Sequence, residues 1–198
     1  MEETALKVLI IDQDTIRASV LESGLTEAGL TDVFVVSEMD GLLRRVVDLD
    51  PDVIFIDLEN PNRDMLEHMF TVSRSVHRPV AMFVDRSDTA MIEAAVDAGV
   101  SAYIVDGLKK ERVKSILDIT ISRFNAVNRL REELEATRGE LADRKVIDRA
   151  KGILMKMRGC SEDDAYKLLR KSAMNQNRRL ADIAESLVTS AGLLGDAE

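Results

Sequence analysis

The chain has 198 residues, of which 45% are hydrophobic, and a formal net charge of −9 at neutral pH. This content suffices for one domain of ordinary size and a smaller helical one, and it excludes a disordered chain. No apolar run approaches the roughly 20 residues that cross a bilayer, and two glutamates stand where a leader would be basic, so we expect a cytoplasmic protein without membrane contact. The single cysteine, Cys160, provides neither a disulfide framework nor a metal-ligand cluster.

Five short apolar runs alternate with helical patterns over the first 120 residues. These runs are residues 7–11, 33–36, 53–56, 80–84 and 102–105. Nearly continuous apolar runs are typical of strands covered on both faces, so the alternation predicts an α/β fold with a doubly wound, five-stranded parallel sheet. Gly29 and Gly99 fit helix ends, and Pro51 and Pro79 lead into strands.

Three aspartates follow the ends of predicted strands. Asp12 and Asp14 come after the first strand and Asp57 after the third. Because the carboxyl ends of parallel strands meet at one edge of the sheet, we expect these carboxylates to converge there. The alternative is that Asp57 merely caps the turn that follows it.

This arrangement, over residues 5 to about 120, resembles the receiver domain of bacterial two-component response regulators. The resemblance implies a flavodoxin-like sheet in which acidic side chains hold Mg²⁺ and the aspartate after the third strand accepts a phosphoryl group. Asp57 matches the acceptor, and Asp12 and Asp57 are the implied metal ligands. The predicted acidic pocket comprises Asp12, Gln13, Asp14 and Asp106 beside the acceptor.

Several positions depart from the receiver pattern. Gln13 replaces a second acidic residue, and Val84 replaces a Thr or Ser that would hydrogen-bond a phosphoryl oxygen. Asp106 and Gly107 replace a lysine and a proline, and Lys109 would compensate only if its loop folds back. Phosphorylation adds about −1.5 to −2 of charge, which would lack its usual counter-charge. We therefore expect a degenerate receiver that needs no cofactor, with phosphorylation of Asp57, assisted by Mg²⁺, as the alternative.

The alternation of apolar runs and helical segments ends at about Leu108. No proline occurs from Lys109 to Arg158, which predicts one long helix, and Val127, Leu130, Leu134 and Leu141 form a short heptad stripe. This stripe predicts a coiled-coil homodimer, with packing on the chain's own receiver as the alternative. Gly159 then ends the helix, a capping pattern at Ser161 starts a helix that reaches about residue 176, and a last helix covers residues 180–194.

The segment from Asp143 to Leu180 is basic within an acidic protein. It contains 11 Lys/Arg and 5 Asp/Glu residues, a local charge of +6, so the remaining residues carry −15. Because phosphate attraction depends on local cation density rather than on total charge, the segment predicts a nucleic-acid contact. Charge alone does not distinguish DNA from RNA.

Three stretches here closely resemble the ANTAR domain, a three-helix RNA-binding module of transcription antiterminators. They read IDRAKGILM at 147–155, SEDDAYKLLRKSAM at 161–174 and LADIAESL at 180–187, within a match over about 125–193. Together with the atypical receiver, the chain resembles the antiterminators that control nitrate and nitrite assimilation genes. The resemblance implies a non-enzymatic regulator, leader-RNA hairpins as ligands and an inhibitory, nitrate-sensing partner protein. We divide the chain into a receiver-like domain (1–122), a coiled-coil linker (123–146) and an ANTAR domain (147–198).

Ten residues of the ANTAR-like region are predicted RNA contacts: Lys145, Arg149, Ala150, Lys151, Gly152, Lys156, Tyr166, Lys167, Arg170 and Lys171. The cations recur at helical spacing on two neighbouring helices, which suits a compact RNA loop better than a duplex DNA groove. Gly152 costs roughly 1 kcal/mol in a helix, which close approach of RNA or of another helix would explain. Tyr166 either stacks on an unpaired base or belongs to the core, and Met155, Met157 and Met174 are predicted core residues.

Two hypotheses on control remain open at this stage. In the first, the receiver is a docking surface and a partner holds the protein inactive. In the second, phosphorylation of Asp57 switches a regulator that acts on RNA or DNA.

Overall fold

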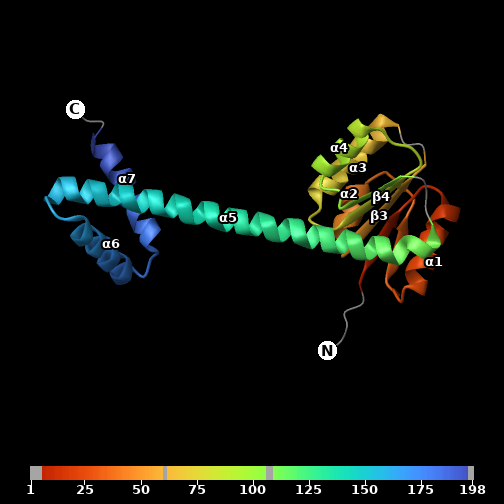
Figure 1. Ribbon diagram of the computed structural model, residues 1–198, viewed down its shortest axis with the longest axis horizontal. Helices are drawn as coiled ribbons and strands as arrows, with labels where there is room; N and C mark the ends of the chain where they lie inside the picture. Colours follow the sequence, from red (N-terminus) through yellow and green to blue (C-terminus); the bar gives the residue numbers. More distant parts are fainter. Residues whose placement is uncertain (1–5, 60–61, 106–108, 196–198) are drawn as a thin grey trace. The chain divides into compact units, whose positions relative to one another are not determined.

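The computed structural model describes residues 6–59, 62–105 and 109–195 (Figure 1). Two compact units, residues 1–128 and 129–198, divide inside the longest helix. The finer boundaries at residues 122 and 146 stay a prediction. Within the described ranges, none of the helices combines the length and the hydropathy needed to cross a bilayer. The elements follow in the order β1 (Val8–Ile11), α1 (Thr15–Glu27), β2 (Val33–Val36), α2 (Leu42–Leu49), β3 (Val53–Leu58), α3 (Arg63–Ser75), β4 (Val80–Val84), α4 (Thr89–Asp97), β5 (Ala102–Val105), η1 (Lys110–Arg112), α5 (Val113–Arg158), α6 (Glu162–Gln176) and α7 (Leu180–Gly195).

The five strands form one parallel sheet in the order β2-β1-β3-β4-β5. This order and the helical crossovers confirm the predicted doubly wound α/β fold. One boundary was wrong: β3 continues through Leu58, so Asp57 lies inside the strand and pairs in register with Phe83 of β4. The central strands β1, β3 and β4 are buried along their whole length because helices cover both faces.

Alternate residues of each strand face two different helical layers. On one face, Ile54 and Ile56 pack with the buried side chains of α2, α3 and α4. On the other, Val53 and Phe55 pack with α1 and with the start of α5, and Figure 1 shows α1 and α5 on the same side of the sheet. Asp57 continues this second alternation, so its side chain belongs to the face that α1 covers.

Helix α1 is held in place by its first turn and by a small residue. Asp14 is the N-cap, and its side chain accepts hydrogen bonds from the backbone N–H groups of Ile16 and Arg17. A side chain at Gly24 would meet Val113 of α5 at 2.9 Å, so this glycine permits the close approach of the two elements. These contacts fix the orientation of α1 on the face of the sheet that it covers.

Helix α5 is a single element of 46 residues, as the proline-free sequence predicts, and the 3-10 helix η1 leads directly into it. Val127, Leu130, Leu134 and Leu141 lie along it with 48–65% of each side chain exposed. These four residues, which we name the heptad stripe, are large apolar side chains on an otherwise charged helix surface. Such a stripe is typical of a helix that pairs with a second helix.

The second unit has a small core between three helices. Ala150 of α5, Leu169 and Ala173 of α6, and Ile183 and Ala184 of α7 are its buried residues. The predicted helix starts and ends are confirmed: Ser161 is the N-cap of α6, and Gly159 has the positive φ of 62° that ends a helix. The prediction for the methionines was wrong, because Met155, Met157 and Met174 lie on the surface, 38%, 67% and 72% exposed.

Candidate functional site

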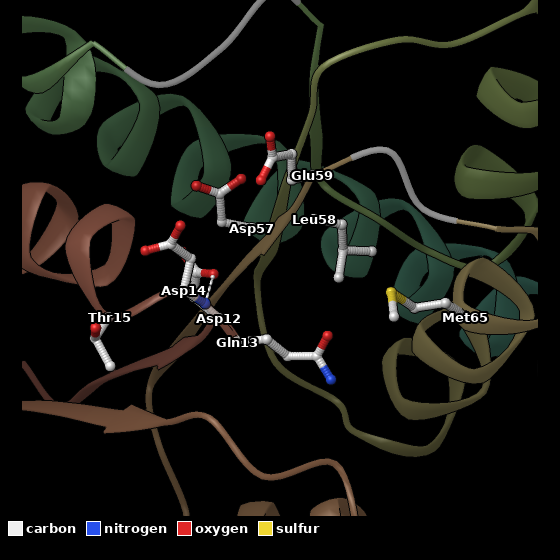
Figure 2. Close-up of a pocket in the computed structure, with 8 residues that line it drawn as sticks. All are labelled: Asp12, Gln13, Asp14, Thr15, Asp57, Leu58, Glu59 and Met65. Atoms are coloured by element: carbon white, nitrogen blue, oxygen red, sulfur yellow. Dashed lines mark hydrogen bonds between the residues drawn. The ribbon is translucent and has the colours of Figure 1, made fainter.

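The carboxyl edge of the sheet forms a polar pocket of about 400 Å³. Figure 2 shows Asp12, Asp14 and Asp57 gathered on one side of it, with Gln13 pointing away from them. Asp12 and Asp57 are buried, whereas Gln13 is exposed. The three carboxylates predicted to converge, Asp12, Asp14 and Asp57, all line this pocket. Asp106, the fourth predicted member of this pocket, lies outside the described residues.

A residue that the sequence prediction missed, Arg17, contacts one of the carboxylates that line this pocket. The Arg17 guanidinium contacts both oxygens of Asp57, donating from Nε to Oδ2 at 3.1 Å and from Nη2 to Oδ1. Its Nη1 lies 3.6 Å from Asp85 Oδ2 and 3.8 Å from Glu59 Oε2. Asp57 thus holds a buried ion pair with Arg17, and the side chain of Asn62 caps α3. The alternative that Asp57 caps the following turn stays a prediction, because residues 60–61 of that turn lie outside the described residues.

The two buried carboxylates, Asp57 and Asp12, differ in their hydrogen-bond partners. Burial raises the pKa of Asp57, and the hydrogen bond from Arg17 acts in the opposite direction. Burial likewise raises the pKa of Asp12 to about 6. Asp12 Oδ1 accepts the backbone N–H of Asp14 at 2.8 Å, but Oδ2 has no hydrogen-bond partner among the described residues. Asp12 is therefore the group in this pocket whose charge is least compensated.

The pocket as it stands does not fit Mg²⁺. A hard divalent cation takes several carboxylate, carbonyl or water oxygens, and both oxygens of Asp57 already accept from Arg17. Gln13 is exposed and supplies no buried carboxylate. Across the described ranges, no three His, Cys, Asp or Glu side chains are arranged to hold a metal ion. The receiver resemblance implies Asp12 and Asp57 as metal ligands, and Arg17 already engages Asp57.

The predicted basic residues of the second unit fall into two groups. Lys145, Arg149 and Lys156 on α5, and Lys167, Arg170 and Lys171 on α6, are exposed. Lys151 is different: its Nζ lies 2.6 Å from both Asp148 Oδ1 and Glu162 Oε1, and 15% of its side chain is exposed. These ion pairs raise the pKa of Lys151, chiefly through the hydrogen bond to Asp148. Lys151 therefore ties α5 to the start of α6.

Two small residues beside Lys151 behave in opposite ways. Ala150 is fully buried in the three-helix core, so its assignment as an RNA contact is corrected. Gly152 is half-buried, but among the described residues a Cβ added to it would meet nothing within 4 Å. The alternative of a tight helix crossing at Gly152 is therefore wrong. Gly152 instead borders a hollow of about 410 Å³ that Arg144 and Met155 also line.

Tyr166 lies on the surface of α6. It is 42% exposed, and its neighbours Ala165 and Leu169 supply the buried face of the helix, so the core alternative was wrong. Tyr166 lines a second hollow of about 410 Å³ together with Arg144 and Ile147. The sequence prediction missed Arg144, an exposed cation that lines both hollows.

Comparisons with known proteins identify two domain families in the chain. The family model of the response regulator receiver domain matches residues 8–118, and that of the ANTAR domain matches residues 135–188. Transcriptional regulatory protein PdtaR of Mycobacterium tuberculosis is 28% identical over 142 residues, which cover 72% of this chain and 69% of PdtaR. The Nitrate regulatory protein of Klebsiella oxytoca is 34% identical over 80 residues, which cover 40% of this chain and 20% of that protein.

Solved structures match the first unit. A CheY-like response regulator receiver domain protein from Methanospirillum hungatei superimposes with a TM-score of 0.53 at 15% identity, over 62% of this chain and 99% of that one. The signal receiver domain of a diguanylate cyclase from Desulfovibrio desulfuricans gives 0.52 at 17% identity, over 61% and 96%. At these identities the likeness shows the fold alone. With both domain models matched in this order, the chain belongs to the response regulators that carry a receiver domain followed by an ANTAR domain.

Proposed function

We propose that this chain is an RNA-binding regulator that acts by transcription antitermination. The observation that carries the proposal is the coincidence of the ANTAR match at residues 135–188 with a three-helix unit that exposes cations on α5 and α6. The stretch from Asp143 to Leu180 has a charge of +6, which attracts phosphate locally although the protein as a whole is acidic.

The surface of this unit suits RNA better than duplex DNA. Tyr166 is partly exposed and lines a hollow together with Arg144. Its ring offers a surface on which an unpaired base can stack. Gly152 leaves open space in which an RNA backbone can approach α5 closely. Both features favour a folded loop with splayed bases, because a regular duplex presents no unstacked base.

The heptad stripe supports a dimeric form of the regulator. A second copy would cover Leu130, Leu134 and Leu141, which are exposed on one helix at the spacing of a coiled-coil seam. A dimer presents two basic units, so binding of one RNA hairpin raises the effective concentration of the second. We therefore infer that the ligand is a leader RNA with two hairpins.

The regulator requires no chemistry of its own. A leader RNA that forms either a terminator or a competing structure is shifted by differential binding alone, so the protein acts without a catalytic residue or a cofactor. The Klebsiella relative is named as a nitrate regulatory protein. By that similarity, we infer that the controlled genes serve nitrate or nitrite assimilation and that a nitrate-sensing protein sequesters the regulator when nitrate is absent.

A phosphorylation-switched regulator is the second candidate. The position of Asp57 in β3 at the acidic pocket favours it, and the engagement of both Asp57 oxygens by Arg17 opposes it. Incubation with a small phosphodonor and Mg²⁺, followed by intact mass measurement, distinguishes the two. A stable mass increase at high occupancy on Asp57 would favour the switch over sequestration.

The proposed ligand is tested by titrating the full-length protein against a two-hairpin leader RNA and against duplex DNA of equal length. We expect tight, salt-dependent binding to RNA and weak binding to DNA. Equal affinity for both would refute RNA recognition and favour a DNA-binding regulator.

A further inference from the structure

Arg17 is the cation that the structure places against Asp57. It belongs to the first turn of α1, three residues after the N-cap Asp14, on the helix that covers the Asp57 face of the sheet. Its side chain is 20% exposed and reaches inward to a fully buried carboxylate. A two-pronged guanidinium–carboxylate contact is the strongest geometry that an arginine offers, and a lysine does not reproduce it.

The charges around Arg17 explain why a cation is needed there. Asp57, Asp85 and Glu59 all lie within 4 Å of its guanidinium, and Asp12 is buried beside them. Buried carboxylates require a compensating cation, because their ionised forms lose solvation when they leave water. Arg17 supplies a single positive charge and contacts both oxygens of Asp57, and Asp12 Oδ2 has no hydrogen-bond partner in the part of the chain that the structure describes.

We propose that Arg17 is a built-in cation that takes the place of a divalent metal ion at the acidic pocket and keeps Asp57 engaged. While Arg17 contacts Asp57, neither oxygen of that carboxylate is available to a metal ion. The receiver is then held in one state whether or not Mg²⁺ is present, which suits control by a partner protein. This inference concerns the receiver alone and does not depend on RNA binding by the second unit.

A consequence follows for the pocket without Arg17. Loss of the guanidinium would free both oxygens of Asp57 beside the orphaned oxygen of Asp12, which is 3% exposed. Two buried carboxylates with at least three free oxygens suit a hard divalent cation. Removal of Arg17 should therefore create a Mg²⁺ requirement that the natural protein lacks.

The test compares the thermal unfolding of the full-length protein in EDTA and in millimolar MgCl₂. Arg17→Gln removes the cation and keeps most of the side-chain stem. Arg45→Gln is the matched control, because Arg45 pairs with the exposed Glu38 away from the pocket. We expect the natural protein and the control to unfold at the same temperature in both buffers. Arg17→Gln should unfold at a lower temperature in EDTA and regain roughly 5 °C when Mg²⁺ exceeds its dissociation constant about tenfold.

Two results would overturn the proposal. One is a Mg²⁺-dependent rise for the natural protein as large as that of Arg17→Gln, which would mean that the guanidinium does not compete with the metal. The other is an Arg17→Gln variant, folded or unfolded in EDTA, that Mg²⁺ does not stabilise, which would reduce Arg17 to an ordinary structural ion pair.

Discussion

Gly152→Ala should change the stability of the helical unit and its affinity for RNA in opposite directions. Gly152 lies inside α5, where glycine is less favourable than alanine by about 0.8–1 kcal/mol. An added Cβ meets nothing within 4 Å, so no steric term offsets this gain. We therefore expect the substitution to stabilise the protein by about 1 kcal/mol, which raises the Tm of a unit of this size by about 4–8 °C.

RNA affinity should change in the opposite direction. The open space at Gly152 borders the hollow lined by Arg144 and Met155, and a methyl group there would stand between α5 and an approaching RNA backbone. Circular dichroism at 222 nm reports the stability of the full-length variant, and fluorescence anisotropy with a labelled two-hairpin RNA reports its affinity. The expected pattern is a higher Tm together with weaker binding.

Gly139→Ala is the matched control for this experiment. Gly139 is also in α5, an added Cβ there likewise meets nothing within 4 Å, and it lies outside the predicted RNA contacts. We expect the same gain in stability with unchanged affinity. If Gly152→Ala binds RNA as tightly as the parent while being more stable, the glycine is no contact point and the RNA surface lies elsewhere.

Four further outcomes follow from the structure. Lys151→Ala should lower the Tm of the helical unit because it removes the ion pair with Glu162 that links α5 to α6, together with the pair with Asp148 inside α5; an unchanged melting curve would contradict this role. Arg170→Ala should leave the Tm unchanged, weaken RNA binding and reduce the salt slope by about 1, measured by anisotropy across a salt series. Leu134→Lys should shift sedimentation toward monomer, and a profile identical to the parent would place the dimer contact elsewhere. The pKa of Asp12 rises on folding from 3.8 to about 6, so between these pH values the folded state binds more protons than the unfolded state. The free energy of unfolding should therefore fall as the pH rises from about 4 to 6. Urea unfolding across this range should show a smaller fall for Asp12→Asn.

The fold was predictable because its signals are local and repeated. Five apolar runs separated by helical patterns indicated a parallel sheet, and the capping residues Ser161 and Gly159 marked the helix ends correctly. The β3 boundary was missed because Asp57 is a charged residue inside a strand, and the side chain that pairs with its buried carboxylate, Arg17, is 40 positions away in the sequence.

The site was less predictable because it depends on tertiary contacts. The sequence around Arg17 does not distinguish it from an arginine on the surface. Its contact with Asp57 results from the packing of α1 on the sheet. Lys151 and Arg170 are likewise equivalent as basic residues, yet one is held between Asp148 and Glu162 and the other is exposed. The surface methionines were missed because each of the three helices in this unit buries only one stripe, which leaves apolar residues of the other faces outside the core.

Binding of the full-length, unphosphorylated protein to a two-hairpin leader RNA is the most direct test of the central claim. We predict tight binding that weakens steeply with salt, little binding to duplex DNA of the same length, and no requirement for Mg²⁺ at the receiver or for a phosphodonor. Binding that appears only after treatment with a phosphodonor, or that does not distinguish the RNA from the duplex, would contradict the account.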